Sequence, residues 1–126
     1  MYQQLDIFSF LDKPTEVKTF NPIEEFALRG SGFANGKKRI QNFFLSNNGI
    51  SDRVKFLKNE YGVGGFEMPC DKPFVLHDGW SNASGCQCQY LNEDMQNVTV
   101  DISYNDLADA IQALISDGRY ESRYGE

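Results

Sequence analysis

The 126-residue sequence has a single histidine, only three cysteines and no long apolar run. One histidine, His77, excludes catalytic schemes that need two imidazole groups. An odd number of cysteines is atypical of a disulfide framework. The roughly 20 apolar residues of a membrane span are missing, and the N-terminal MYQQLDIFSF lacks the basic and apolar regions of a signal peptide. We therefore expect a cytoplasmic protein with reduced thiols.

Hydrophobic residues are nevertheless abundant enough for one modest core, because they make up 40% of the chain and aromatic residues 13%. A chain of this length has no room for a second independent core. The regular apolar pattern begins at residue 22, after a polar stretch that contains a proline. We predict a flexible N-terminal tail over 1–21, a single domain over 22–120 and a frayed C-terminus over 121–126.

The order of the predicted elements indicates an α+β fold, in which N-terminal helices precede a small antiparallel β-sheet and a C-terminal helix packs on it. Asn21 and Pro22 suit the start of the first helix, and Gly30 or Gly32 suits its end. Spacing and turn residues predict further helices over 37–46 and 51–61, strands over 74–76, 87–91 and 97–102, a turn-rich segment over 77–85, and a last helix between Ser103 and Gly118.

Charge is segregated along the chain, although the net charge is only −6. Residues 29–58 have a net charge of +6, whereas residues 59–126 have a net charge of −9. The basic segment has a helix-turn-helix-like layout, and clustered cations on a rigid face can contact the phosphates of DNA or RNA. The other interpretation is two solvated faces that attract each other within the fold. The candidate basic residues are Arg29, Lys37, Lys38, Arg39, Arg53, Lys55 and Lys58.

Three aspartates of the acidic half are spaced to share the outer side of the last helix. They are Asp106, Asp109 and Asp117. Such carboxylates most often form a solvated face. Alternatively, they imitate a row of phosphates and occupy a basic nucleic-acid channel on a host protein. In that case they should be free of partners such as Arg119, and Tyr104 and Tyr120 are the predicted aromatic anchors beside them.

A short N-terminal motif resembles the peptide by which proteins bind the bacterial sliding clamp. It consists of Gln4, Leu5, Asp6, Ile7 and Phe8. Such an extended peptide inserts a Leu and an aromatic residue into apolar pockets, while its Gln hydrogen-bonds at the rim. The alternative is that the apolar side chains of the motif pack on the domain's own core.

Four residues of the second half are of types that bind zinc, namely Cys70, His77, Cys86 and Cys88. The Cys-x-Cys spacing is shorter than that of a zinc knuckle, and on a strand it places both thiols on one face. This pattern favours buried free thiols over a metal site, so we expect no metal and no cofactor.

The glycine-rich segments 30–32 and 62–65 do not have the context of phosphate-binding loops. Neither follows a strand and opens a helix that carries the Lys-Ser/Thr pair of such a loop. Helix C-caps and tight turns account for both segments.

Two longer runs, FALRGSGFANGKKRIQNFF over 26–44 and FLKNEYGVGG over 56–65, and the tripeptide Gly118-Arg119-Tyr120, resemble a segment of known proteins. These are the very large helicase-and-DNA-methylase proteins of conjugative elements of Gram-positive bacteria and of phages. The resemblance covers most of residues 22–120, except the β-region between 66 and 100. It implies a mobile-element or phage origin and a role connected with nucleic acids or host defence, and it assigns no catalytic residue.

Together these features predict a non-enzymatic binding protein of a phage or mobile element, because no acid–base pair, metal set or nucleophile constellation emerges. Our first hypothesis is an inhibitor of a host nucleic-acid-processing defence complex, of the anti-CRISPR or anti-restriction type. The second is a DNA-binding accessory module that is recruited to the replication sliding clamp.

Overall fold

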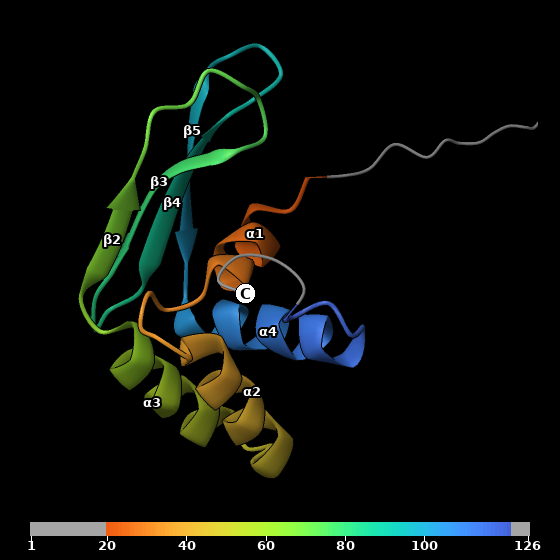
Figure 1. Cartoon of the computed structure of the whole chain (residues 1–126). Helices are drawn as coiled ribbons and strands as arrows, with labels where there is room; N and C mark the ends of the chain where they lie inside the picture. Colours follow the sequence, from red (N-terminus) through yellow and green to blue (C-terminus); the bar gives the residue numbers. More distant parts are fainter. Residues whose placement is uncertain (1–19, 122–126) are drawn as a thin grey trace, which may run out of the picture.

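A computed structural model describes residues 20–121 of the chain, as four helices and a four-stranded sheet. The first and last helices lie beside one side of the sheet, and the second and third lie beyond one of its ends (Figure 1). In chain order the elements are α1 (Pro22–Arg29), α2 (Gly36–Ser46), α3 (Ile50–Tyr61), β2 (Gly64–Glu67), β3 (Leu76–Ser81), β4 (Cys86–Leu91), β5 (Asn97–Ile102) and α4 (Tyr104–Ser116). The strands are antiparallel neighbours in the order β2-β3-β4-β5. The predicted α+β class is confirmed.

The ends of α1 and α4 follow from their local sequence. The side-chain oxygen of Asn21 accepts hydrogen bonds from the backbone N–H groups of Ile23 and Glu24, both at 3.1 Å. Gly30 ends α1 with a φ of 81°, a conformation that is unstrained only for glycine. At α4 the hydroxyl of Ser103 accepts from the N–H of Asp106 at 3.0 Å. Both predicted caps are therefore present.

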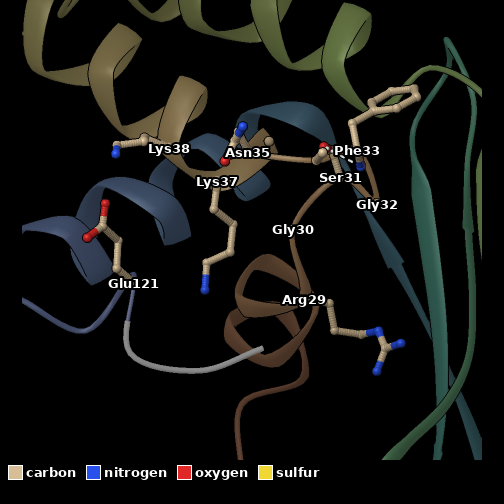
Figure 2. A pocket seen from close by; sticks show the side chains of 11 residues that line it. Arg29, Gly30, Ser31, Gly32, Phe33, Asn35, Lys37, Lys38 and Glu121 are labelled. Atoms are coloured by element: carbon tan, nitrogen blue, oxygen red, sulfur yellow. Dashed lines mark hydrogen bonds between the residues drawn. The ribbon is translucent and has the colours of Figure 1, made fainter. Parts of the chain in front are cut away.

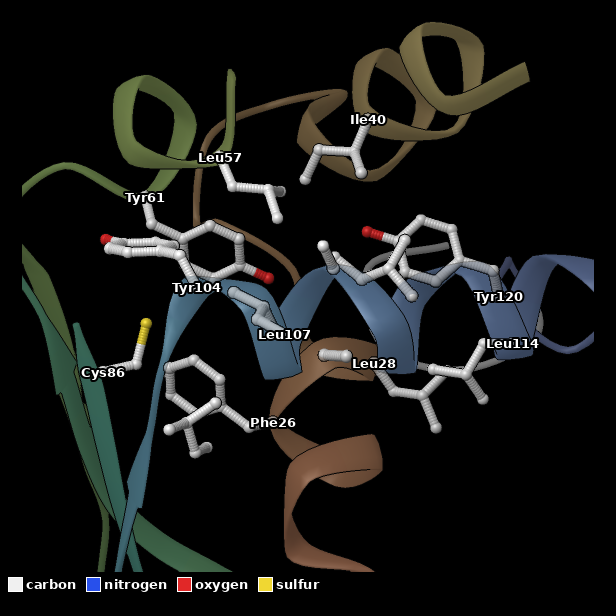
Figure 3. Close-up of a cluster of buried hydrophobic side chains, with 14 of the residues drawn as sticks. Phe26, Leu28, Ile40, Leu57, Tyr61, Cys86, Tyr104, Leu107, Leu114 and Tyr120 are labelled. Carbon is white, nitrogen blue, oxygen red and sulfur yellow. The ribbon is translucent and has the colours of Figure 1, made fainter. Parts of the chain in front are cut away.

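The core lies between the helices and the inner face of the sheet (Figure 3). Helix α1 packs against α4 and against β3 and β4, while α3 packs against α4 and α2. Leu28, Leu107 and Ile111 are fully buried where α1 meets α4, and Leu57 is fully buried on α3. The helical hairpin α2–α3 thus packs against α4, and the end of α3 also reaches the sheet, where the hydroxyl of Ser81 donates to the carbonyl of Tyr61 at 3.4 Å.

The region between residues 62 and 85 differs from the prediction. The strand expected over 74–76 is wrong except for its last residue, and the expected turn over 77–85 is present only over 82–85, because β3 occupies Leu76–Ser81 and pairs with a further strand, β2. Glycine, aspartate and serine made this segment resemble a turn. The reason for a glycine here is tertiary: a Cβ on Gly79 would lie 2.4 Å from the ring of Phe66, which packs over it.

No helix within residues 20–121 is long and apolar enough to cross a membrane.

The predicted tail over 1–21 and the frayed end over 121–126 lie largely outside these residues. The segment after α4 packs against the helices, since Tyr120 is buried and the guanidinium of Arg119 forms an ion pair with Glu24 on α1 at 3.1 Å.

Candidate functional site

The seven predicted basic residues do not form one patch in the structure. Arg29, Lys37 and Lys38 line one cavity of about 490 Å³ at the start of α2. Lys55 and Lys58 line a second cavity of about 230 Å³ on α3, beside Asn105 at the start of α4. The remaining two, Arg39 and Arg53, are bound into the fold.

The first cavity is built from the loop that joins α1 to α2. Asn35 occupies the N-cap of α2 in a left-handed conformation with a φ of 63°, and its side chain makes no capping hydrogen bond. The first turn of α2 contains no acidic residue. The first N–H groups of a helix lack partners within the helix and carry a partial positive charge, so this end of α2 favours anions, whereas the carboxylate of Glu121, which also lines the cavity, opposes them.

The cations at this cavity diverge (Figure 2). Lys38 and Arg29 point to opposite sides, with Lys37 between them. The guanidinium of Arg29 lies 3.9 Å from the centre of the Phe66 ring, and the ammonium of Lys37 lies 5.1 Å from that of Tyr120. Divergent cations suit successive phosphates of an extended chain better than one compact phosphate.

Arg39 and Arg53 each bridge α2 and α3 through hydrogen bonds, so neither is an uncommitted cation of a basic surface. Two nitrogens of Arg39 donate to the two carboxylate oxygens of Glu60, at 3.0 and 2.9 Å. This contact raises the pKa of Arg39 above its ordinary value, so its charge is committed to Glu60. Arg53 donates to the backbone carbonyl groups of Phe44 at 2.7 Å and of Asn47. It thereby satisfies carbonyls at the end of α2.

The three aspartates of the predicted acidic row are all exposed, but only two stay clear of Arg119. Asp106 and Asp109 lie on the outer side of α4. Asp117 lies 3.9 Å from a nitrogen of Arg119, which contradicts the expectation that it has no such partner. The acidic row is therefore shorter than its sequence spacing indicated.

The predicted aromatic anchors of that row are in the core. Tyr104 is 3% exposed and Tyr120 is 1% exposed. The hydroxyl of Tyr104 donates to the carbonyl of Asn82 at 2.6 Å, and burial raises the pKa of both tyrosines well above the ordinary value. The interface role predicted for these side chains is wrong, because Tyr104 is buried at the start of α4 and Tyr120, which follows the end of α4, is buried beneath Lys37 of α2.

The four zinc-type residues are not brought together. The thiols of Cys86 and Cys88 are free and face the core from β4, where burial raises the pKa of each to about 11. His77 bonds instead to the side-chain oxygen of Asn97 at 2.7 Å, and the Cys70 thiol contacts the carbonyl of Lys72. Among residues 20–121, no cluster of three or more potential metal ligands occurs.

The outer face of the sheet, on the side away from the helices, was not predicted as a site. Trp80 is 42% exposed there, and its indole N–H donates to the side-chain oxygen of Gln87 at 3.1 Å. Gln87 in turn donates to a carboxylate oxygen of Asp101 at 2.8 Å. The alternation of residues 97–102 indicated an outward Asp101, but nothing in the sequence showed that Trp80 lies in a strand beside it.

The chain matches no protein-family model, and neither a curated protein nor a solved structure is significantly similar to it. The resemblance to a segment of the helicase-and-methylase proteins therefore stays a prediction from its motifs. The clamp-like motif of residues 4–8 lies outside the described residues.

Proposed function

We propose that this chain is a non-enzymatic binding protein of a phage or mobile element, which docks on the nucleic-acid-binding surface of a host defence complex and inhibits it. The observation that carries this proposal is the separation of charge in the folded chain. Residues 64–102 contain six acidic groups and one basic group, whereas residues 36–61 contain six basic groups and two acidic groups. The sheet and the α2–α3 hairpin lie on different sides of α1 and α4 (Figure 1).

An acidic surface of this kind suits a partner that normally binds DNA or RNA. The basic groove of such a partner is complementary to carboxylates as it is to phosphates, and long-range attraction accelerates their association. Salt screens this attraction over about 8 Å at physiological ionic strength. The exposed carboxylates are available from two places, Asp106 and Asp109 on α4 and the outer face of the sheet.

The test is protection of a plasmid or phage in cells that carry a panel of CRISPR and restriction systems. The expected result is protection in at least one system, together with a stable complex whose association rate falls as salt is raised. The proposal is wrong if the wild-type chain protects against no system of the panel.

A second candidate function is supported by the cavity at the start of α2. Its cations and helix N-terminus suit the phosphates of a nucleic acid, as an accessory module recruited to DNA requires. If Lys37 and Lys38 contact phosphates, Lys37→Glu/Lys38→Glu lowers affinity for DNA and reduces the slope of log affinity against log salt by about two units.

The matched control is Lys55→Glu/Lys58→Glu, which changes the net charge equally on α3. A cavity-specific contact predicts that the control keeps the slope. Equal effects of both pairs, or no DNA binding at low salt, exclude this second function.

A further inference from the structure

The outer face of the sheet combines one exposed aromatic ring with several acidic and amide side chains. Strand alternation places them on the side opposite the buried Cys86 and Cys88. We call this surface the Trp80 face, and it comprises Glu67, Asp78, Trp80, Gln87, Gln89 and Asp101. Helix α1 packs on the other side of the sheet, while α2 and α3 lie beyond its end (Figure 1).

Trp80 is held in place by a row of hydrogen bonds across three strands. It is the register partner of Gln87, which is the register partner of Asp101. The same three side chains are linked by the two hydrogen bonds given above. Because the only polar atom of the indole is already bonded, the exposed part of the ring offers its aromatic surface. A fixed aromatic ring loses little conformational entropy on binding, as is typical of interface hot spots.

The carboxylates of the Trp80 face are arranged so that a cation would stabilise them. Glu67 on β2 is the direct register partner of Asp78 on β3, and both side chains are on this face. Like charges directly opposite each other destabilise a sheet. Within residues 20–121 neither carboxylate forms an ion pair, so no cation of the described fold relieves this repulsion.

We propose that the Trp80 face binds an arginine-bearing segment of a protein partner. A guanidinium stacks on the indole of Trp80 and pairs with the carboxylates of Asp78, Glu67 or Asp101 beside it. Arginine suits this surface better than lysine, because its planar group stacks on aromatic rings and pairs with carboxylates in two-point contacts. A nucleic acid is disfavoured, because its phosphates would be repelled. This inference rests on the proposed function and names its docking surface.

The chain contains a single tryptophan, so its fluorescence reports on this face alone. The probe is a labelled nona-arginine peptide, with nona-lysine as the control of equal charge. Anisotropy of the label measures affinity, and acrylamide quenching of Trp80 measures exposure of the indole. We expect nona-arginine to bind roughly threefold or more tighter than nona-lysine and to reduce the quenching.

Two pairs of substitutions separate this face from general acidity. Asp78→Asn/Asp101→Asn and Asp106→Asn/Asp109→Asn each remove two negative charges, from the Trp80 face and from α4 respectively. We expect the first pair to weaken nona-arginine binding about fivefold or more, and the second to change it less than twofold. Trp80→Ala should weaken binding about tenfold. Melting curves of each variant establish that the fold is retained.

Several results would overturn the proposal. They are binding of nona-arginine without any change in Trp80 quenching, equal weakening by the two aspartate pairs, and self-association of the chain that buries Trp80. Failure of the proposed function is recognised separately, because wild-type protein that binds nona-arginine at Trp80 but protects no plasmid retains this inference and loses the other. If the Trp80→Ala variant still protects a plasmid, the proposed function is retained and this inference is lost.

Discussion

The α2–α3 hairpin and the β-sheet carry opposite charge and use it in different ways. In the hairpin two of the arginines are engaged in the fold, since Arg39 pairs with Glu60 and Arg53 binds the carbonyls at the end of α2. On the outer face of the sheet, Glu67 and Asp78 are adjacent carboxylates without an ion pair inside the described fold. Charged residues of a basic segment can therefore be structural, while acidic residues from different strands can be brought together as a surface.

The α2–α3 hairpin and the sheet are also attached to the rest of the fold in different ways. The hairpin meets the rest of the chain through one apolar side, in which Leu57 contacts the core around α4. The sheet meets α1 through the closely packed inner face of β3 and β4. If apolar packing, and not charge, holds each region in place, substitutions in the packed sides should lower stability more than substitutions in ion pairs.

The largest effect is expected at the hairpin–α4 contact. Leu57→Ala removes a fully buried side chain and should lower the free energy of unfolding by about 2–5 kcal/mol. The control is Leu45→Ala on α2, where the side chain is 69% exposed and the expected change is within about 0.5 kcal/mol. Urea denaturation followed by circular dichroism measures both. Equal effects would show that the hairpin is not held by this side chain.

The next effect is expected at the inner face of the sheet. Gly79→Ala places a methyl group against the Phe66 ring and should lower the free energy of unfolding by about 1–3 kcal/mol. Gly49→Ala is the control, because a Cβ there meets its nearest atom at an ordinary 3.7 Å. A Gly79→Ala variant as stable as wild type would mean that Phe66 does not pack over this position.

A smaller effect is expected from pH, through the buried thiols of the sheet. Burial raises the pKa of Cys86 and Cys88 to about 11 in the folded chain, above the unfolded value of 9.0. The folded state holds these protons more tightly, so their stabilising contribution is complete below pH 9 and is lost as pH rises towards 11. Urea midpoints measured across this range should fall.

In the matched test, Cys86→Ala/Cys88→Ala should make the urea midpoint fall less steeply as pH rises, whatever the two substitutions do to stability at pH 7. In native protein at pH 8, a thiol reagent should modify Cys70 first and the other two only after unfolding. Equal rates of modification at all three thiols would contradict the burial of Cys86 and Cys88.

The smallest effect is expected at the ion pair of the hairpin. Arg39→Gln and Glu60→Gln should each lower the melting temperature only slightly, because Arg39 is solvent-exposed and such pairs are screened. High salt should reduce the difference from wild type. A large loss of stability that persists at high salt would mean that charge, and not the apolar side, attaches α2 to α3.

Much of the fold was predictable from the sequence, because several signals are local. The caps at Asn21 and Ser103 determine where α1 and α4 begin, and the alternation of residues 97–102 gives β5 its two faces. The Cys-x-Cys spacing placed both thiols on one side of a strand, and the structure buries both. Each of these signals involves residues only a few positions apart, so chain geometry alone converts it into structure.

The site was far less predictable, because it depends on residues that are distant in the chain. Helical spacing indicated the exposed Asp106 and Asp109, but it could not show that Tyr120 turns inward beneath α2. Charge counting grouped Arg39 with Lys37, although Glu60, on the next helix, engages Arg39.

The sequence by itself determined the helix boundaries, the α+β order and the segregation of charge, since these depend on short-range backbone preferences and on composition. Tertiary structure alone decided that residues 76–81 form a strand, because the partner β2 and the ring of Phe66 supply the pairing and packing that a glycine-containing segment lacks. That strand carries Trp80 to the surface beside Gln87 and Asp101. A surface made by pairing between strands exists only once the register is formed, and register is a property of the folded sheet.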